Sequence, residues 1–138
     1  MYILHTYVIV ELVHVGHIIS YGNQKIHFLL EQMNINFKSE YQISYKDKNY
    51  RYDFAILDKN NLIKCFIEYD GQQHFYYTSY GWNTKDNFKK QQDRDKNKND
   101  YAREKNIPLI RIPYYDYEKI NIEYLKSLFF QYNIIIDF

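Results

Sequence analysis

Cysteine and net charge are both scarce in this 138-residue sequence. Its one cysteine, Cys65, excludes an internal disulfide and a cysteine-rich zinc site, and it fits a reducing, intracellular setting. The 18 basic and 17 acidic residues leave a formal net charge of +1, which excludes a strongly basic nucleic-acid binder. Any affinity for nucleic acid must therefore come from local patches of charge.

Long hydrophobic runs are also missing, and no uninterrupted run is long enough to cross a membrane. Residues 1–19 are apolar, but three histidines and Glu11 interrupt them. This stretch has no basic start and no small-residue cleavage site, so we expect no signal peptide. The sequence predicts a strand around Tyr2–Val15 and a protein inside the cell, in the cytoplasm or nucleoid of its host.

Aromatic side chains, by contrast, make up 20% of the residues, with 17 tyrosines and 9 phenylalanines. Surface tyrosines can stack on nucleic-acid bases or anchor an interface. A biased coding composition explains the excess equally well, because lysine, asparagine and isoleucine are abundant too. The length and the 46% hydrophobic content predict one globular domain over residues 1–138.

Two neighbouring segments, residues 51–58 and 62–74, carry acidic residues inside apolar runs. Both segments are rich in aromatic and β-branched residues, and a turn at residues 59–61 separates them. This pattern predicts two strands that pair as a hairpin.

The acids of this hairpin are expected on one face, because side chains alternate along a strand. Alternation separates Asp53 from the apolar row of its own strand, which consists of Tyr52, Phe54 and Ile56. In the second strand, Glu68 and Asp70 share a face, so pairing of the two acidic rows would bring three carboxylates together. Close carboxylates need a proton or a cation, and Mg²⁺ prefers oxygen ligands. The alternative is an ordinary solvent-facing row of acids on a half-exposed hairpin.

The rest of the chain alternates between helical and strand patterns. Apolar residues at helical spacing or in short runs predict further elements. The expected helices cover residues 24–33, 85–106 and 119–130, and the expected strands cover residues 37–44, 109–112 and 134–138. This order predicts an α/β sandwich with a mixed sheet.

The helix expected at residues 85–106 is polar and rich in charge of both signs. Lys90, Arg94 and Lys98 fall near one side of it, and they are candidates for a stripe that contacts phosphates. The other explanation is a solvated helix stabilised by internal ion pairs. Arg111 is unusual inside a short apolar strand, so we expect it either to pair with an acid of the central cluster or to reach a phosphate.

Several motifs resemble one known group of nucleases. They are Ser20-x-Gly22 before a helix, Tyr52-Asp53-Phe54, the run from Ile67 to Gly71 followed by Gln73-His74, Asp95-x-x-Lys98 and the strand that contains Arg111. The set resembles the small endonuclease-like proteins of the PD-(D/E)XK superfamily, in the branch related to very-short-patch-repair, phage and homing endonucleases. The resemblance covers about residues 20–115.

This resemblance implies a restriction-endonuclease-like three-layer sandwich that hydrolyses phosphodiester bonds in DNA with Mg²⁺ or Mn²⁺. Asp53 and Glu68 match the two metal-binding acids, and Asp70 stands where a lysine is usual in the core motif, as it does in this branch. His74 matches a histidine that serves proton transfer or contacts the leaving group. Lys98 matches a helix lysine that supplies the missing positive charge.

One position departs from the pattern, because relatives usually carry a glutamate where this chain has Asn23. Glu40 and Glu31 are the candidate substitutes. Two other functions therefore stay open: a nucleic-acid-binding or regulatory protein that keeps the nuclease fold without the reaction, and a protein-interaction module. A homodimer is a further expectation, because one small domain often needs a second copy to cut both DNA strands.

Overall fold

The structure is a computed structural model that describes residues 20–71 and 84–136. The strand expected at Tyr2–Val15 and the candidate residue His74 lie outside these ranges. The elements in chain order are α2 (Tyr21–Gln32), β1 (Phe37–Tyr45), β2 (Lys48–Leu57), β3 (Ile63–Asp70), α3 (Lys85–Glu104), β4 (Leu109–Pro113), the 3-10 helix η2 (Tyr114–Lys119) and α4 (Ile122–Gln131).

The strands form one four-stranded sheet in the order β1-β2-β3-β4. The first three strands are antiparallel, whereas β4 runs parallel to β3. A parallel pair needs a crossover connection, and α3 lies in that connection. The sequence prediction of an α/β fold with a mixed sheet is therefore confirmed.

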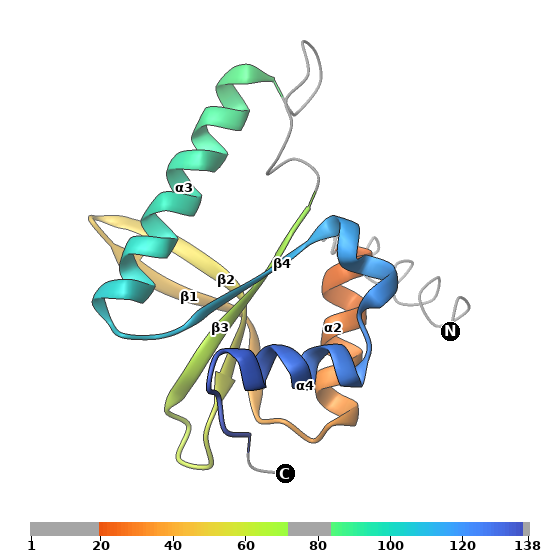
Figure 1. Cartoon of the computed structure of the whole chain (residues 1–138). Helices are drawn as coiled ribbons and strands as arrows, with labels where there is room; N and C mark the ends of the chain where they lie inside the picture. The colour runs from red at the N-terminus through yellow and green to blue at the C-terminus, as the bar shows by residue number, and fades with distance from the viewer. Residues whose placement is uncertain (1–19, 72–83, 137–138) are drawn as a thin grey trace, which may run out of the picture.

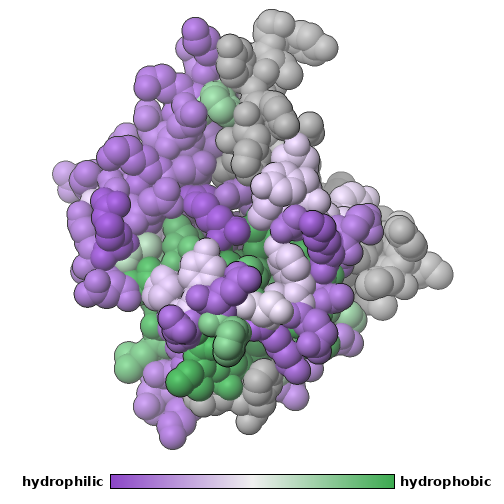
Figure 2. Space-filling view, in the orientation of Figure 1, coloured by the Kyte–Doolittle hydropathy of each residue, from purple (hydrophilic) through white to green (hydrophobic). Residues whose placement is uncertain are grey.

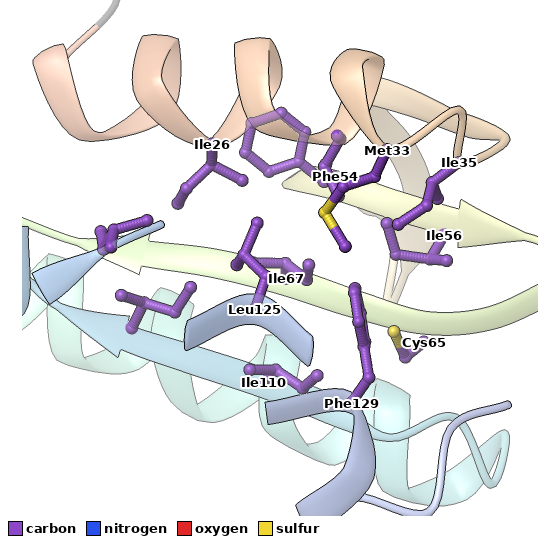
Figure 3. Close-up of a cluster of buried hydrophobic side chains, with 13 residues drawn as sticks. Ile26, Met33, Ile35, Phe54, Ile56, Cys65, Ile67, Ile110, Leu125 and Phe129 are labelled. Atoms are coloured by element: carbon purple, nitrogen blue, oxygen red, sulfur yellow. The ribbon is translucent and has the colours of Figure 1, made fainter. Parts of the chain in front are cut away.

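Helices cover both faces of the sheet (Figure 1). On one face, α2 and α4 pack on β2, β3 and β4, and Figure 3 shows Ile26, Leu125 and Phe129 pointing into this cluster. On the other face, α3 contributes Ala102 to a second cluster, in which tyrosines of the β1–β2 hairpin are prominent. None of the helices in the described ranges combines the length and apolar character that a membrane span requires.

Most element boundaries agree with the sequence prediction, and capping residues explain the shifts. The first helix starts at Tyr21 because the side chain of Ser20 accepts a hydrogen bond from the backbone N–H of Asn23, at 3.1 Å. The last helix starts three residues later than predicted, because Asn121 caps it. The predicted strand at residues 134–138 is wrong in its described part, since residues 134–136 form no strand.

The predicted shared face of Tyr52 with Phe54 and Ile56 is wrong. Tyr52 packs on the α3 side of the sheet, whereas Phe54 and Ile56 pack on the α2 side. The register that pairs β1 with β2 is the same before and after this point of the strand, and it places Glu40 of β1 opposite Asp53 of β2. Glu40 has a φ of 50°, a left-handed conformation that breaks regular alternation. Asp53 therefore lies at the point where the side chains of β2 change their alternation between the two faces of the sheet.

Gly22 allows α2 to approach the end of β3. A Cβ atom at this position would lie 2.2 Å from ring atoms of Tyr69, which is far inside van der Waals contact. Alanine normally favours a helix over glycine, but here the ring leaves no space for its methyl group. The close approach fixes the first turn of α2 against the strand that carries Glu68.

We expect Gly22→Ala to lower the free energy of unfolding by about 1–3 kcal/mol, because the overpacking outweighs the gain in helix propensity. Chemical denaturation measures this change. Gln32→Ala, at an exposed position of the same helix, is the control and should be close to neutral. A stabilised Gly22→Ala variant would contradict the close packing.

Candidate active site

Asp53 and Glu68 face each other where the β2–β3 ladder opens. The register pairs Phe54 with Ile67, and one step further it places Asp53 opposite Glu68. The backbone N–H of Asp53 donates to Glu68 Oε1 at 2.9 Å, and the backbone N–H of Tyr69 donates to Asp53 Oδ2 at 2.8 Å. Each carboxylate is therefore oriented by an amide of the neighbouring strand, and the convergence expected for these two acids is confirmed.

Lys98 of α3 joins this pair of acids. Its ammonium Nζ lies 2.8 Å from Glu68 Oε1, and the side chains of Lys98 and Glu68 are only 11% and 4% exposed. An ion pair this deeply buried is held tightly, because breaking it would leave an uncompensated charge in the interior. The helix thus supplies a cation to the strand acids from a distant part of the chain.

Asp53, Glu68 and Lys98 together carry a net charge of −1 when all three are ionised. Burial, and then the neighbouring charge of Asp53, raise the pKa of Glu68 to about 7, although Lys98 acts in the opposite direction. A carboxyl group with such a pKa is partly protonated near neutral pH. The excess charge can be neutralised by a proton or by a bound cation.

Asp70 does not join the other two acids, so the predicted three-carboxylate metal site does not form. Arg111 Nη1 lies 2.7 Å from Asp70 Oδ1, and the guanidinium also donates to Asn99 Oδ1 at 3.0 Å and 3.2 Å. The expectation that Arg111 pairs with one of the three hairpin acids is confirmed. Within residues 20–71 and 84–136, no group of three or more histidine, cysteine or acidic side chains is arranged to hold a metal ion.

Exposed basic side chains of α3 form ion pairs within the helix. Asp100 contacts Lys96 at 3.0 Å and Arg103 at 2.6 Å, which supports the predicted solvated helix. Figure 2 shows the surface over α3 as almost entirely hydrophilic. Of the four candidate phosphate contacts, Lys98 and Arg111 point inward to acids, whereas Lys90 and Arg94 are exposed.

The two candidate substitutes for the glutamate that is missing at position 23, Glu31 and Glu40, are both exposed. The buried Oδ1 atom of Asn23 accepts no hydrogen bond from the described part of the chain. Glu31 bonds to His27 at 2.8 Å on an exposed side of α2. Glu40 stands opposite Asp53 in the register but lies 3.7 Å from Arg51 and is half exposed.

Sequence reasoning assigned no role to Tyr50 and Tyr52, whose hydroxyl groups contact α3. Tyr52 donates to the carbonyl oxygen of Lys98 at 2.6 Å, and Tyr50 accepts from Asn97 Nδ2 at 2.9 Å. The signal that could have found them is the recurrence of tyrosine at every second residue of a strand that faces a polar helix.

One protein family matches residues 24–127 of the chain, and its description reads "Protein of unknown function (DUF2726)". The chain belongs to the DUF2726 family. The matched range contains the carboxylate pair, Lys98 and Arg111, whereas Asn23 lies just before it.

A viral protein is similar to this DUF2726 chain. It is "Uncharacterized protein 307L" of Invertebrate iridescent virus 6, with 32% identity over 89 residues. The match covers 59% of the DUF2726 chain and 45% of the viral protein, so the chain spans less than half the length of that relative. No solved structure matches the chain.

The raised pKa of Glu68 predicts how stability depends on pH. Between about pH 4.5 and 7, the folded protein keeps a proton on Glu68 that the unfolded chain releases. The proton retained by Glu68 stabilises the folded protein fully below pH 4.5, and this contribution is lost as the pH rises through about 7. We therefore expect the free energy of unfolding to fall by on the order of 3 kcal/mol as the pH rises across this window.

Urea denaturation at several pH values measures this slope. Glu68→Gln removes the titrating group and should flatten the pH dependence, even though its overall stability changes because Lys98 loses its partner. Glu118→Gln, at an exposed position, should keep the wild-type slope. Equal slopes for all three proteins would rule out a buried, proton-retaining Glu68.

Proposed function

We propose that the protein is a metal-dependent DNA endonuclease with a restriction-endonuclease-like three-layer sandwich of the PD-(D/E)XK type. The observation that supports this most directly is the grouping of Asp53, Glu68 and Lys98. Two acids face each other on adjacent strands, and a buried lysine lies 2.8 Å from the second acid. This combination of two carboxylates and a lysine is what the resemblance implies.

The residues present fit a divalent cation. The two carboxylates supply the oxygen ligands that Mg²⁺ and Mn²⁺ prefer. Both polar contacts of Glu68, with Asp53 N–H and with Lys98, use Oε1. Burial, and then the neighbouring charge of Asp53, raise the pKa of Glu68, and a bound cation would relieve the repulsion between the two acids. Asp53 and Glu68 would therefore hold the metal, which would lower the pKa of a bound water and neutralise charge on the phosphate.

The side chains around the acids have separate tasks in this proposal. The amides of Asp53 and Tyr69 keep the two carboxylates in place. The ammonium of Lys98 stabilises negative charge that develops on the phosphate, and His74 transfers a proton or contacts the leaving group. Exposed Lys90 and Arg94 contact the DNA backbone, which would make binding sensitive to salt. The enzyme would act inside the cell, and cutting both strands would take two copies.

Two observations favour a second function, which is nucleic-acid binding without cleavage. Asp70 is neutralised by Arg111 and does not reach the carboxylate pair as a third acid. An amide also stands at Asn23, where the resemblance expects an acid. Such a protein would keep the salt-dependent contacts of α3 but lack a complete metal site.

We expect Asp53→Asn to abolish Mg²⁺-dependent nicking of plasmid DNA while the fold stays intact, because the amide oxygen can still accept from Tyr69 but carries no charge for the metal. Gel electrophoresis of plasmid, linear and branched DNA with Mg²⁺, Mn²⁺ or EDTA measures the activity.

Asp93→Asn is the matched control, since Asp93 is an exposed acid on α3, and it should cleave as the wild type does. Unchanged cleavage by Asp53→Asn would refute the assignment. A salt-dependent gel shift by the wild type without cleavage under any metal condition would support the second function.

A further inference from the structure

Tyr52 contacts Lys98 at both ends of the lysine residue. Its hydroxyl donates to the backbone carbonyl of Lys98 at 2.6 Å, and the Lys98 ammonium lies 5.3 Å from the centroid of the tyrosine ring. The ring itself is fully buried and stacks on Phe66, with centroids 3.7 Å apart and an interplanar angle of 3°. A rigid aromatic support therefore lies beneath the cation that pairs with Glu68.

Helix α3 has little apolar packing that would fix its rotation and position along the sheet. Only Lys98, Asp100 and Ala102 are buried among its 20 residues. A slip by one residue would move the helix by about 1.5 Å and turn it by about 100°, which would take the ammonium away from the acid. Directional polar contacts must therefore set the register of α3.

We propose that Tyr52 is the positioning residue that places the Lys98 ammonium against Glu68. The positioning itself is independent of the reaction, whereas its effect on catalysis rests on the proposed nuclease function.

Tyr50 offers a matched comparison. It lies two residues earlier on the same strand, and its hydroxyl accepts from the side chain of Asn97, the helix residue just before Lys98. Tyr50→Phe therefore removes one hydroxyl contact with α3, as Tyr52→Phe does. Only Tyr52→Phe removes the hydrogen bond to Lys98, and both variants keep the aromatic ring.

The first experiment observes Lys98 directly by NMR in protein labelled with ¹⁵N-lysine. In the wild type, we expect a resolved side-chain ammonium signal that is absent in Lys98→Arg, because this ion-paired group is shielded from water. Tyr52→Phe should speed exchange of that signal with water by about three- to tenfold, the effect of losing one hydrogen bond. Tyr50→Phe should leave it unchanged.

The second experiment compares steady-state nicking by the same proteins. Tyr52→Phe should lower kcat by a similar factor without changing KM, because DNA contacts are intact while the cation is displaced. Unchanged ammonium exchange in Tyr52→Phe, or equal changes in both tyrosine variants, would overturn the proposal. If the wild type does not cleave DNA, the nuclease function fails and the NMR result still decides the role of Tyr52.

Circular dichroism checks that each variant is folded. If Tyr52→Phe does not fold, the wild-type hydroxyl proton of Tyr52 gives the answer. A hydroxyl bonded to the Lys98 carbonyl resists exchange and gives an NMR signal, whereas a freely exchanging hydroxyl would overturn the proposal.

Discussion

The site depends on an exchange of hydrogen bonds between two strands, in which carboxylates replace backbone carbonyls as acceptors. Glu68 accepts from the amide of Asp53, and Asp53 accepts from the amide of Tyr69. The exchange satisfies buried amides where the ladder opens, and it fixes the direction of both acids. It also forces two negative charges together in a place with little water. Burial and the charge of Asp53 raise the pKa of Glu68, whereas the amide of Asp53 and the ammonium of Lys98 favour its ionised form.

Polar contacts join α3 to the sheet, whereas apolar packing joins α2 and α4. The α2 and α4 side has a continuous apolar cluster (Figure 3), but the α3 side relies on side chains that reach individual polar groups. Tyr52 binds the carbonyl of Lys98, and Arg111 binds Asn99. The two faces of the sheet therefore serve different purposes. One face supplies most of the buried apolar surface, and the other sets the position of charged groups.

Strand alternation and helical spacing were enough to predict the α/β class, the central hairpin and the opposition of Asp53 and Glu68. Alternation failed at Tyr52, because the left-handed conformation of Glu40 belongs to a neighbouring strand and leaves no mark on the β2 sequence. Alternation held for Glu68 and Asp70, which both lie on the α3 side of β3. It could not show that Asp70 pairs with Arg111, because Arg111 is 41 residues away and becomes adjacent only through the parallel pairing of β3 and β4. Lys98 was found by resemblance, since nothing in its local spacing shows that it turns inward.

Because Lys98 lies on a helix rather than on β3, the length of the connection between the acid and the lysine can vary. Lys98 reaches Glu68 across thirty residues of sequence, about twice the separation of Asp53 and Glu68. Closing a loop of doubled length costs only about 0.6 kcal/mol more in chain entropy. The connection between strand and helix can therefore lengthen or shorten over evolution at small thermodynamic cost. The acid–lysine pair can stay constant while the intervening segment diversifies.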